Sequence, residues 1–428
     1  MHNGRRIAIL GATGSIGVAT LDVVAQLGQR FPADDWRVSA ISGHRQIDEL
    51  IKAAHAAQPV PDLIVVSDAD GADQARARMA QYGLQRQCRL DVGPEALVRA
   101  ATDEAVDTVV AAIVGRAGLE STLAAVEAGK RVGLANKETL VIAGPVVTAA
   151  AARSGAELLP IDSEHSAIYQ CLAEARCLNS HATHPSAADG ETRCSGTAGV
   201  DSTPAKLPGV RRLILTASGG PFRDCSVAEM ENATPAAALK HPTWDMGQKI
   251  TIDSATMMNK ALEIIEAKWL FDVPADRIEV VIHPQSIIHS LVEFEDGSVV
   301  AQLSPPDMRL PIQYALTYPS RLPCPAPALD RQQTWDMSLI PVDADRFPAL
   351  ELGFEVARVG GTAGVVLNGA NEVAVPLFLS GKIRFTDIAR LCKQTLEDHN
   401  HESAPSLQRL LQLDEWARLR AQKIAETI

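Results

Sequence analysis

Hydrophobic positions in the first 160 residues come in short β-branched runs, separated by longer stretches rich in alanine and leucine. Such alternation predicts strands connected by helices, as in a doubly wound parallel sheet. The run at 107–114 has almost no polar position, as expected of a strand that helices cover on both faces, so we place it near the centre of the sheet. The predicted strands are 6–10, 37–42, 63–67, 108–114 and 131–135.

This pattern breaks off between residues 173 and 211, where His, Ser, Thr, Gly, Pro and Asp dominate. Their composition predicts a surface insertion with little order and no catalytic group. Hydrophobic periodicity then resumes, and we interpret the region as a second α/β unit with a partly antiparallel sheet. Its predicted elements are a strand at 212–216, a helix near 255–271, and strands at 278–282, 287–293 and 298–303.

The last part of the chain is predicted to be helical. Prolines punctuate residues 305–327, which we interpret as a linker. Helical periodicity follows, which indicates a small helical domain at the C-terminus. The predicted helices are 347–359, 364–380, 385–397 and 407–427.

Composition narrows the classes of function. The 428 residues are 46% hydrophobic, enough for about three domains of roughly 150 residues each. Forty basic against 52 acidic residues give a charge of −12, which disfavours a nucleic-acid partner. No apolar run approaches the roughly 18 to 20 residues that span a bilayer, so we expect neither membrane insertion nor secretion. Seven cysteines without a C-x-x-C pair favour a reducing cytoplasm over a disulfide framework or thiolate zinc site.

A glycine-rich loop, Gly11-Ala-Thr-Gly14-Ser-Ile-Gly17, separates the first predicted strand from a helix that begins near Ile16. Small residues there let backbone N–H groups and the helix dipole approach a pyrophosphate. The spacing departs from G-x-G-x-x-G, and a tight turn without a ligand is the alternative. Because the Lys-Ser/Thr ending of a nucleoside-triphosphate loop is absent, dinucleotide binding is favoured over ATP or GTP hydrolysis.

The residues after the second predicted strand bear on the choice of dinucleotide. The sequence Ser42-Gly43-His44-Arg45 has no acidic residue where an NAD enzyme would hold the ribose 2′-hydroxyl group. Arg45 is either a partner for the 2′-phosphate of NADP or an ordinary solvated surface charge. We therefore expect a preference for NADPH over NADH.

Asp162-Ser163-Glu164 follows the apolar run 156–161. In an extended segment, residues two apart point to the same side, so both carboxylates would face one ligand and would suit a divalent cation. The alternative is a helix N-cap, because a helical pattern begins at Ser166. The local sequence does not decide between the two.

The segment from Asp253 to Trp269 is the most distinctive. Asp253 or Ser254 is predicted to cap a helix on which Asn259, Lys260 and Glu263 share one face. The alternative is an ordinary exposed ion pair between Lys260 and Glu263.

Two loops and one lysine complete the candidate residues. The loop 216–222 offers free backbone amides and the hydroxyl of Ser218, whereas the loop 241–247 combines His241 with Trp244 and Met246. Both suit anionic ligands, although either is also compatible with simple turn chemistry. Lys137 ends a predicted strand at the edge of the sheet where ligands bind.

Together these motifs resemble the 1-deoxy-D-xylulose-5-phosphate reductoisomerase family over nearly the whole chain. The motifs, in the family's order, are G-A-T-G-S-I-G, L-A-N-K-E, P-I-D-S-E-H, A-S-G-G-P-F, H-P-T-W-D-M-G, D-S-A-T-M-M-N-K-A-L-E and I-H-P-Q-S-I-I-H-S. The resemblance implies conversion of 1-deoxy-D-xylulose 5-phosphate to 2-C-methyl-D-erythritol 4-phosphate in isoprenoid precursor biosynthesis. The implied cofactors are NADPH and a divalent metal, Mg²⁺ or Mn²⁺ or else Co²⁺. Retroaldol cleavage and a concerted shift are not distinguished.

The same resemblance implies a cytoplasmic, V-shaped homodimer of α/β class. An N-terminal doubly wound Rossmann-like domain would bind NADPH at residues 1–160. A central α/β catalytic domain with a mixed sheet, a metal site and a mobile flap would occupy residues 161–311. A linker at 312–337 would lead to a C-terminal helical bundle at 338–428.

Residue roles are carried over by position in the family's motifs. The implied metal ligands are Asp162, Glu164 and Glu263, and Lys137 and His241 join them as catalytic residues. The implied substrate contacts are Lys137, Ser163, Glu164, Ser218, His241, Trp244, Met246, Ser254, Asn259, Lys260 and Glu263. The implied NADPH contacts are Gly11, Thr13, Gly14, Ser15, Ile16, Gly43, His44, Arg45, Asn136, Glu138 and Gly247.

Two features depart from the family pattern. Positions 44 and 45 vary in such enzymes, so the 2′-phosphate contact is open, and the segment 173–211 is longer than usual. Two other functions remain as alternatives. Another NADP-dependent oxidoreductase, such as a semialdehyde dehydrogenase, would need a cysteine in a catalytic motif. A catalytically dead NADP-binding regulatory protein would be expected to have lost some of the metal or phosphate residues.

Overall fold

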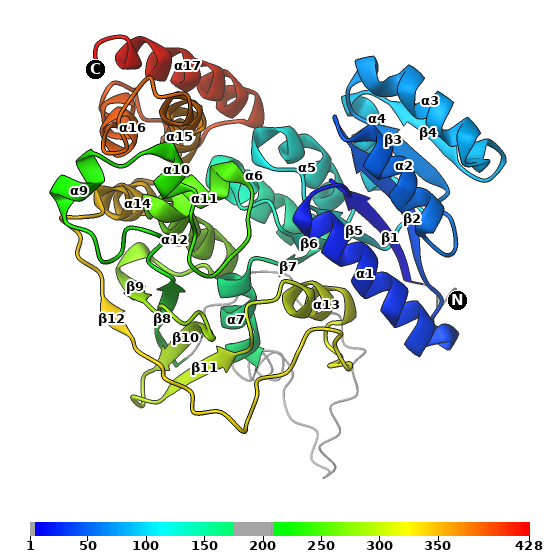
Figure 1. Cartoon of the computed structure of the whole chain (residues 1–428), viewed down its shortest axis with the longest axis horizontal. Coiled ribbons are helices and arrows are strands. Elements are labelled where there is room, and N and C mark those ends of the chain that lie inside the picture. Colours follow the sequence, from blue (N-terminus) through cyan, green and yellow to red (C-terminus); the bar gives the residue numbers. More distant parts are fainter. Residues whose placement is uncertain (1–4, 174–206, 208) are drawn as a thin grey trace.

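A computed structural model describes residues 5–173, 207 and 209–428 of the chain. Its first sheet has parallel strands in an order that reverses beside β1, which is the predicted doubly wound topology (Figure 1). The strand predicted near the centre pairs with a neighbour on each side and is fully buried, but it ends at Ala111 rather than at residue 114, and Val114 is exposed. The order is β4 (Arg89–Val92), β3 (Leu63–Val66), β2 (Trp36–Gly43), β1 (Arg5–Leu10), β5 (Thr108–Ala111), β6 (Arg131–Leu134) and β7 (Glu157–Pro160).

Helices cover both faces of this sheet. Ile7 and Ile9 of β1 belong to one hydrophobic core and the alternate residues Ala8 and Leu10 to another, which explains why residues 7–10 of the strand include no polar position. The sequence pattern missed β4, a partly exposed edge strand with two charged positions among four. The connecting helices are α1 (Ser15–Arg30), α2 (Ile47–Ala56), α3 (Ala72–Gln81), α4 (Pro94–Thr102), α5 (Leu119–Glu127) and α6 (Glu138–Ser154).

Close packing explains two of the three glycines in the loop between β1 and α1. Gly11 has φ +95°, and a Cβ atom there would lie 2.6 Å from the carbonyl oxygen of Ala112. A Cβ atom on Gly17 would clash with the backbone of Gly11 and Ala12. Gly14 is different, because an added Cβ would have no neighbour closer than 3.6 Å. Gly14, at the start of α1, is therefore not required by close packing.

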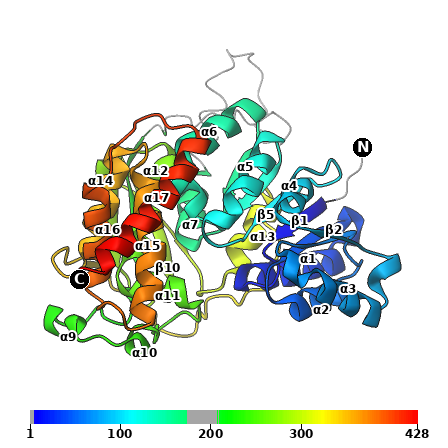
Figure 2. The ribbon, with the colours of Figure 1, turned by 90° about the horizontal axis from the view of Figure 1, so that it is seen from above.

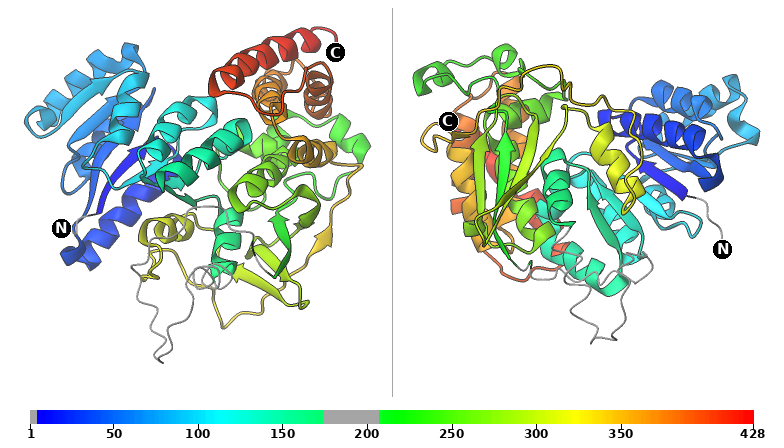
Figure 3. Two further views of the ribbon diagram at one scale, coloured as in Figure 1. Left: turned by 180° about the vertical axis from the view of Figure 1, so that it is seen from behind. Right: turned by 90° about the horizontal axis from the view of Figure 1, so that it is seen from below.

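The second sheet is mixed, as the sequence predicted. Only β8 and β9 are parallel, and the other neighbouring strands are antiparallel. The sheet packs against α7 (Ser163–Cys171) and α12 (Met258–Phe271) (Figure 3). Its order is β11 (Val299–Leu303), β10 (Ile288–Phe294), β8 (Val210–Ala217), β9 (Ile278–Ile282) and β12 (Ile340–Pro341).

The prediction of a linker at 305–327 is wrong in part, because α13 (Arg309–Thr317) lies inside it and packs on α1. Pro311 is tolerated in the first helical turn, where a backbone N–H has no partner within the helix, and Ile312 and Leu316 are buried. The boundary predicted between 311 and 312 thus falls inside a helix. Three further helices lie between β8 and α12, namely α9 (Val227–Glu231), α10 (Pro235–Ala238) and α11 (Gln248–Ala255).

The predicted C-terminal helices are present, on the side of the molecule away from α3 (Figure 2). They are α14 (Pro348–Val359), α15 (Ala363–Leu379), α16 (Asp387–Glu397) and α17 (Leu407–Ala425). The helix α12 is held between α6 and α14 by close packing at glycines. The ring of Trp269 lies against Gly144 of α6, and a Cβ atom on Gly353 of α14 would lie 2.6 Å from the Cα atom of Ala261.

The predicted insertion at 173–211 lies largely outside the described residues, so the structure does not test the expectation that it has little order. Among the helices that are described, none combines the length and the apolar character needed to cross a bilayer. Five of the seven cysteines are described, and all five are free thiols: Cys88, Cys171, Cys225, Cys324 and Cys392.

Candidate active site

The largest collection of predicted site residues lines one cavity of about 620 Å³. It lies between the carboxyl ends of β5 and β6, the loop before α1, and the elements α7, α11 and α12. No cysteine is among its lining residues, so it lacks the nucleophile that a semialdehyde dehydrogenase would need.

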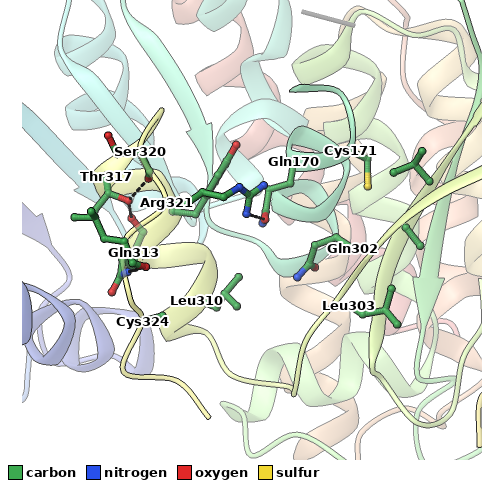
Figure 4. A pocket seen from close by; sticks show the side chains of 14 residues that line it. Gln170, Cys171, Gln302, Leu303, Leu310, Gln313, Thr317, Ser320, Arg321 and Cys324 are labelled. Atoms are coloured by element: carbon green, nitrogen blue, oxygen red, sulfur yellow. Dashed lines mark hydrogen bonds between the residues drawn. The ribbon is translucent and has the colours of Figure 1, made fainter. Parts of the chain in front are cut away.

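A second pocket, of about 400 Å³, lies between α7, β11 and α13 (Figure 4). In it the guanidinium of Arg321 donates a hydrogen bond to Oε1 of Gln170 at 3.0 Å. Its lining residues include no Asp, Glu, His or Lys. The larger cavity is therefore the one equipped for acid–base or metal chemistry.

Three carboxylates meet at the wall of the larger cavity, two of them lining it and the third buried behind it. Asp162, Glu164 and Glu263 each contribute an oxygen, and the three oxygens lie within 4.8 Å of one another. The extended geometry considered for the first two is wrong, because Glu164 lies in the first turn of α7. Asp162 occupies the N-cap position of that helix, but its side chain makes no capping hydrogen bond. Its carboxylate instead faces the cavity and is available to a ligand.

Two lysines neutralise part of this charge. Lys137, directly before α6, places its Nζ atom 2.5 Å from Oδ2 of Asp162 and 3.2 Å from Oε1 of Glu263. Lys260 donates to Oε1 of Glu164 at 2.8 Å and contacts the other oxygen of Glu263. The amide of Asn259 donates to Glu263 at 2.5 Å and accepts from Lys137 at 2.8 Å. Three acids and two bases leave one negative charge, which favours binding of a further cation.

Burial and neighbouring charges shift the pKa values in this cluster. Burial raises the pKa of Asp162, but the stronger effect of Lys137 and His165 holds it well below its usual range. Glu263 is fully buried, and burial together with Glu164 raises its pKa. Burial lowers the pKa of Lys137, yet Asp162 and Glu263 raise it well above the ordinary value. Lys137 therefore stays cationic, and a divalent cation would hold Glu263 in its charged form.

The buried pair His165 and Glu266 was missed by the sequence reasoning. Nε2 of His165 is 3.0 Å from the backbone oxygen of Glu263, and Nδ1 is 3.3 Å from Oε2 of Glu266. Burial lowers the pKa of His165, but Glu266 and Asp162 raise it to about 9. With Asp162 these two residues form a second group with metal-binding spacing. Neither His165 nor Glu266 lines the cavity, whereas Asp162 and Glu164 do, so the group of three carboxylates is the one that a ligand in the cavity would reach. The signal in the sequence was the i,i+3 spacing of Glu263 and Glu266.

The predicted cap of the long helix is also wrong. Asp253 and Ser254 lie near the end of α11, and α12 begins after Met257, which has φ +61°. A left-handed residue breaks the run into two helices, which the periodicity alone did not reveal. Ser254 still lines the cavity, together with Asn259 and Lys260.

Ser218 follows β8 and lines the same cavity. Its Oγ atom accepts a hydrogen bond from the N–H of Gly220 at 3.2 Å and lies 2.9 Å from Nε2 of His241. Gly219 and Gly220 both have positive φ, which few other residues adopt. The loop thus contributes Ser218 to the cavity that Ser254, Asn259 and Lys260 also line, and these four residues are the predicted phosphate-binding set.

Hydrogen bonds of the His241 ring hold the start of the loop 241–247 in place. Its Nδ1 atom accepts hydrogen bonds from the backbone N–H groups of Thr243 and Trp244, at 3.2 and 2.9 Å. Nδ1 is therefore unprotonated, and Nε2–H donates to Ser218. Burial, together with Arg223, lowers the pKa of His241, which agrees with a neutral ring. Trp244 is only partly buried, so it is not a residue of the hydrophobic core, and its ring centroid lies 6.4 Å from that of His289.

The residues predicted to contact NADPH divide into two groups. Those that line the cavity are Thr13, Gly14, Ser15, Ile16, Asn136, Glu138 and Gly247. Gly11, Gly43, His44 and Arg45 do not line it. His44 and Arg45 are exposed, and Nδ1 of His44 lies 3.1 Å from the hydroxyl of Ser67. Gly11 instead permits the close approach of β1 to Ala112. Every residue predicted to bind metal or substrate does line the cavity except Glu263, which lies buried behind it and reaches it through Lys137, Asn259 and Lys260.

Comparison with protein families gives three matches along the chain. A model described as 1-deoxy-D-xylulose 5-phosphate reductoisomerase matches residues 7–144. A model of the C-terminal domain of 1-deoxy-D-xylulose 5-phosphate reductoisomerase matches residues 158–271. A model described as DXP reductoisomerase C-terminal domain matches residues 303–420.

Individual proteins are similar over almost their full lengths. The 1-deoxy-D-xylulose 5-phosphate reductoisomerase of Rhodopirellula baltica is 66% identical over 432 residues, with 98% of this chain and 95% of the relative covered. The enzyme of the same name from Cupriavidus metallidurans is 48% identical, with 98% and 97% covered. A crystal structure of DOX-P reductoisomerase in complex with NADPH, fosmidomycin and magnesium has a TM-score of 0.86 at 43% identity, covering 99% and 98%. The Zymomonas mobilis enzyme in complex with NADPH has a TM-score of 0.84 at 40% identity, covering 99% and 100%.

Proposed function

The chain belongs to the 1-deoxy-D-xylulose 5-phosphate reductoisomerase family, and we propose that the cavity described above is where it carries out that reaction. The chain converts 1-deoxy-D-xylulose 5-phosphate to 2-C-methyl-D-erythritol 4-phosphate, using NADPH and a divalent metal. The observation that carries the assignment of the site is the meeting of three carboxylates and two lysines beside the glycine-rich loop. A catalytically dead relative is disfavoured because the full set of charged groups is present.

The residues present fit both cofactors. Asp162, Glu164 and Glu263 offer converging oxygen ligands, which suit Mg²⁺ or Mn²⁺ better than zinc. For NADPH, Gly14 lines the cavity at the start of α1, where N–H groups attract a pyrophosphate. Asn136 also has a buried side-chain oxygen without a hydrogen-bond partner, at the wall of the cavity. The bound metal supplies Lewis acidity toward the oxygens of the substrate, and NADPH supplies the hydride.

The side chains of the cavity have separate tasks in this proposal. Ser218, Ser254, Asn259 and Lys260 hold the phosphate group at one end of the substrate. Lys137 and Ser163 contact the carbon chain, where negative charge develops on oxygen as a bond beside the ketone breaks. His241, Trp244 and Met246 close over the substrate and exclude water, so that the enolate and the hydride do not meet solvent protons.

We assign these tasks to the parts of the chain as follows. Residues up to 160 supply most of the NADPH contacts, and residues 161 to 317 supply the metal ligands and the substrate contacts other than Lys137, a range extended to include α13. The four C-terminal helices support α11 and α12 from behind through α14 and α15. The free cysteines among the described residues suit the reducing cytoplasm, which is where we place the enzyme.

One assay tests the function and the cofactor preference together. Oxidation of NADPH should require both 1-deoxy-D-xylulose 5-phosphate and a divalent metal, and kcat/KM should be at least about tenfold higher with NADPH than with NADH. Absence of turnover with the complete mixture would refute the function. A cofactor preference that survives Arg45→Ala would move the 2′-phosphate contact to His44, Ser42 or Ser67, and equal values would remove the preference.

We also propose that the enzyme is a homodimer that pairs through the edge strand β11. One side of β11 has no strand partner within the described part of the chain, and Val299 and Val300 are half exposed there. An apolar edge of this kind favours pairing with a second copy. Sedimentation velocity should give about twice the mass of one chain, and Val300→Lys should shift the protein toward monomer. A wild-type protein that sediments as a monomer at micromolar concentration would contradict this proposal.

A further inference from the structure

Lys249 occupies a junction between three parts of the molecule. It lies in the first turn of α11, two residues after the loop 241–247 ends. Its Nζ atom is 3.1 Å from Oε1 of Glu138, the first residue of α6, and 2.8 Å from Oδ2 of Asp253. The other oxygen of Asp253 accepts a hydrogen bond from the amide of Asn371 in α15, at 2.9 Å. A line of polar contacts thus joins the NADPH-binding unit, the helix behind the loop, and the C-terminal bundle.

Neighbouring charges shift the pKa values of Lys249 and Glu138. Burial lowers the pKa of Lys249, but Asp253 and Glu138 outweigh it and raise that pKa above its ordinary value. Burial raises the pKa of Glu138, but Lys249 outweighs it and lowers that pKa. Glu372 of α15 adds a further negative charge near Lys249. Lys249 and Glu138 therefore both remain ionised at neutral pH.

These charges are shielded from water but reach the cavity. The Asp253 side chain is 2% exposed, that of Glu138 is 9% and that of Lys249 is 26%, and all three residues line the cavity. Removing one member of a buried ion pair leaves the other uncompensated, which is costly. Movement of α11 away from α6 would separate Lys249 from Glu138 in the same way. The pair therefore holds the start of α11, directly after the loop 241–247, against the start of α6 in the NADPH-binding unit.

We propose that Lys249 is a positioning residue that couples NADPH binding to closure of the loop 241–247, through its ion pair with Glu138. The inference rests on the proposed function, in which Glu138 is a cofactor contact and the loop covers the substrate. Lys249 holds the Glu138 carboxylate at the wall of the NADPH site. In turn, Asp253 and Asn371 hold Lys249, so the C-terminal bundle sets the position of the cofactor wall.

The test uses Lys249→Met, Glu138→Gln and the double variant, with Lys249→Arg as the conservative replacement. NADPH binding is measured by the fluorescence of the bound cofactor, in full-length protein without metal or substrate. We expect Lys249→Met to raise the Kd for NADPH about tenfold. The double variant should bind NADPH no more weakly than the single variant with the lower affinity, as expected of two residues that act as a pair. Lys249→Arg should stay within about threefold of wild type. Proteolysis within 241–247 should be slowed by NADPH in the wild type and much less in Lys249→Met.

A matched control is Lys52→Met, which removes an exposed lysine paired with Glu49 on α2, and it should change neither readout. If Lys249→Met lowers the melting temperature but leaves NADPH affinity and loop protection as in wild type, the lysine has only a structural role and the proposal is wrong. If Lys249→Met does not fold, Glu138→Gln decides, because it leaves the pair of Lys249 with Asp253 intact. Unchanged NADPH affinity and loop protection in that variant would also overturn the proposal. A wild-type protein that binds no NADPH would refute the proposed function instead.

Discussion

Glu263→Gln should lower kcat/KM about a thousandfold, which corresponds to roughly 4 kcal/mol of transition-state stabilisation. The side chain is fully buried and is contacted by Lys137, Asn259 and Lys260. An amide of the same shape preserves the packing but removes the charge that, with Asp162 and Glu164, would hold a divalent cation. The metal affinity, measured by calorimetry with Mn²⁺ alone, should therefore fall together with turnover.

The exposed Glu355 of α14 provides the matched control, because Glu355→Gln changes the same charge outside the cavity and should leave both measurements unchanged. The fold of Glu263→Gln should survive, since Lys137 keeps Asp162 as a partner and Lys260 keeps Glu164. Near-normal turnover and metal affinity in a folded Glu263→Gln protein would show that the three carboxylates are not the metal site. A large drop in melting temperature without a change in metal affinity would assign Glu263 a purely structural role.

Trp244→Ala should lower kcat/KM about a hundredfold while changing the melting temperature by less than about 2 °C. Trp244 is partly exposed, on a loop held by two backbone hydrogen bonds to His241, so its removal leaves little cavity behind. A buried core tryptophan would instead cost about 3–5 kcal/mol of stability. The expected loss arises because the ring no longer covers the substrate and excludes water.

Limited proteolysis supplies an independent measurement of the same loop. Cleavage near Trp244 should occur in the free enzyme and be suppressed when NADPH, metal and a phosphonate substrate analogue are bound together. Trp335→Ala is the control for Trp244→Ala and should leave kcat/KM unchanged, because Trp335 lies on the irregular segment before β12 and outside the cavity. Unchanged cleavage on ligand binding, together with a large drop in the melting temperature of Trp244→Ala, would contradict the role of this loop as a lid.

The sequence by itself determined the order and type of most elements. Alternating short and long hydrophobic segments predicted the parallel sheet, and the later strands predicted the mixed sheet. Both predictions were possible because the spacing of hydrophobic residues depends on whether one or both faces of an element are buried. Most of the site residues that the motifs named line one cavity. The sequence pattern did not predict elements with little apolar surface, such as β4 with its charged positions. It also did not predict α13, because a proline lies in the first turn of that helix.

Tertiary structure decided the relations between distant residues. Glu164 and Glu263 are 99 positions apart, and no local pattern shows that both reach Lys260. The left-handed Met257, which divides α11 from α12, and the helical position of Glu164 also depend on packing that a single segment does not contain. No local motif marks Lys249, because its partner Glu138 comes from α6 and the partner of Asp253, Asn371, comes from α15. Periodicity records which face of an element is buried, whereas the partner that buries it is chosen only when the whole chain packs.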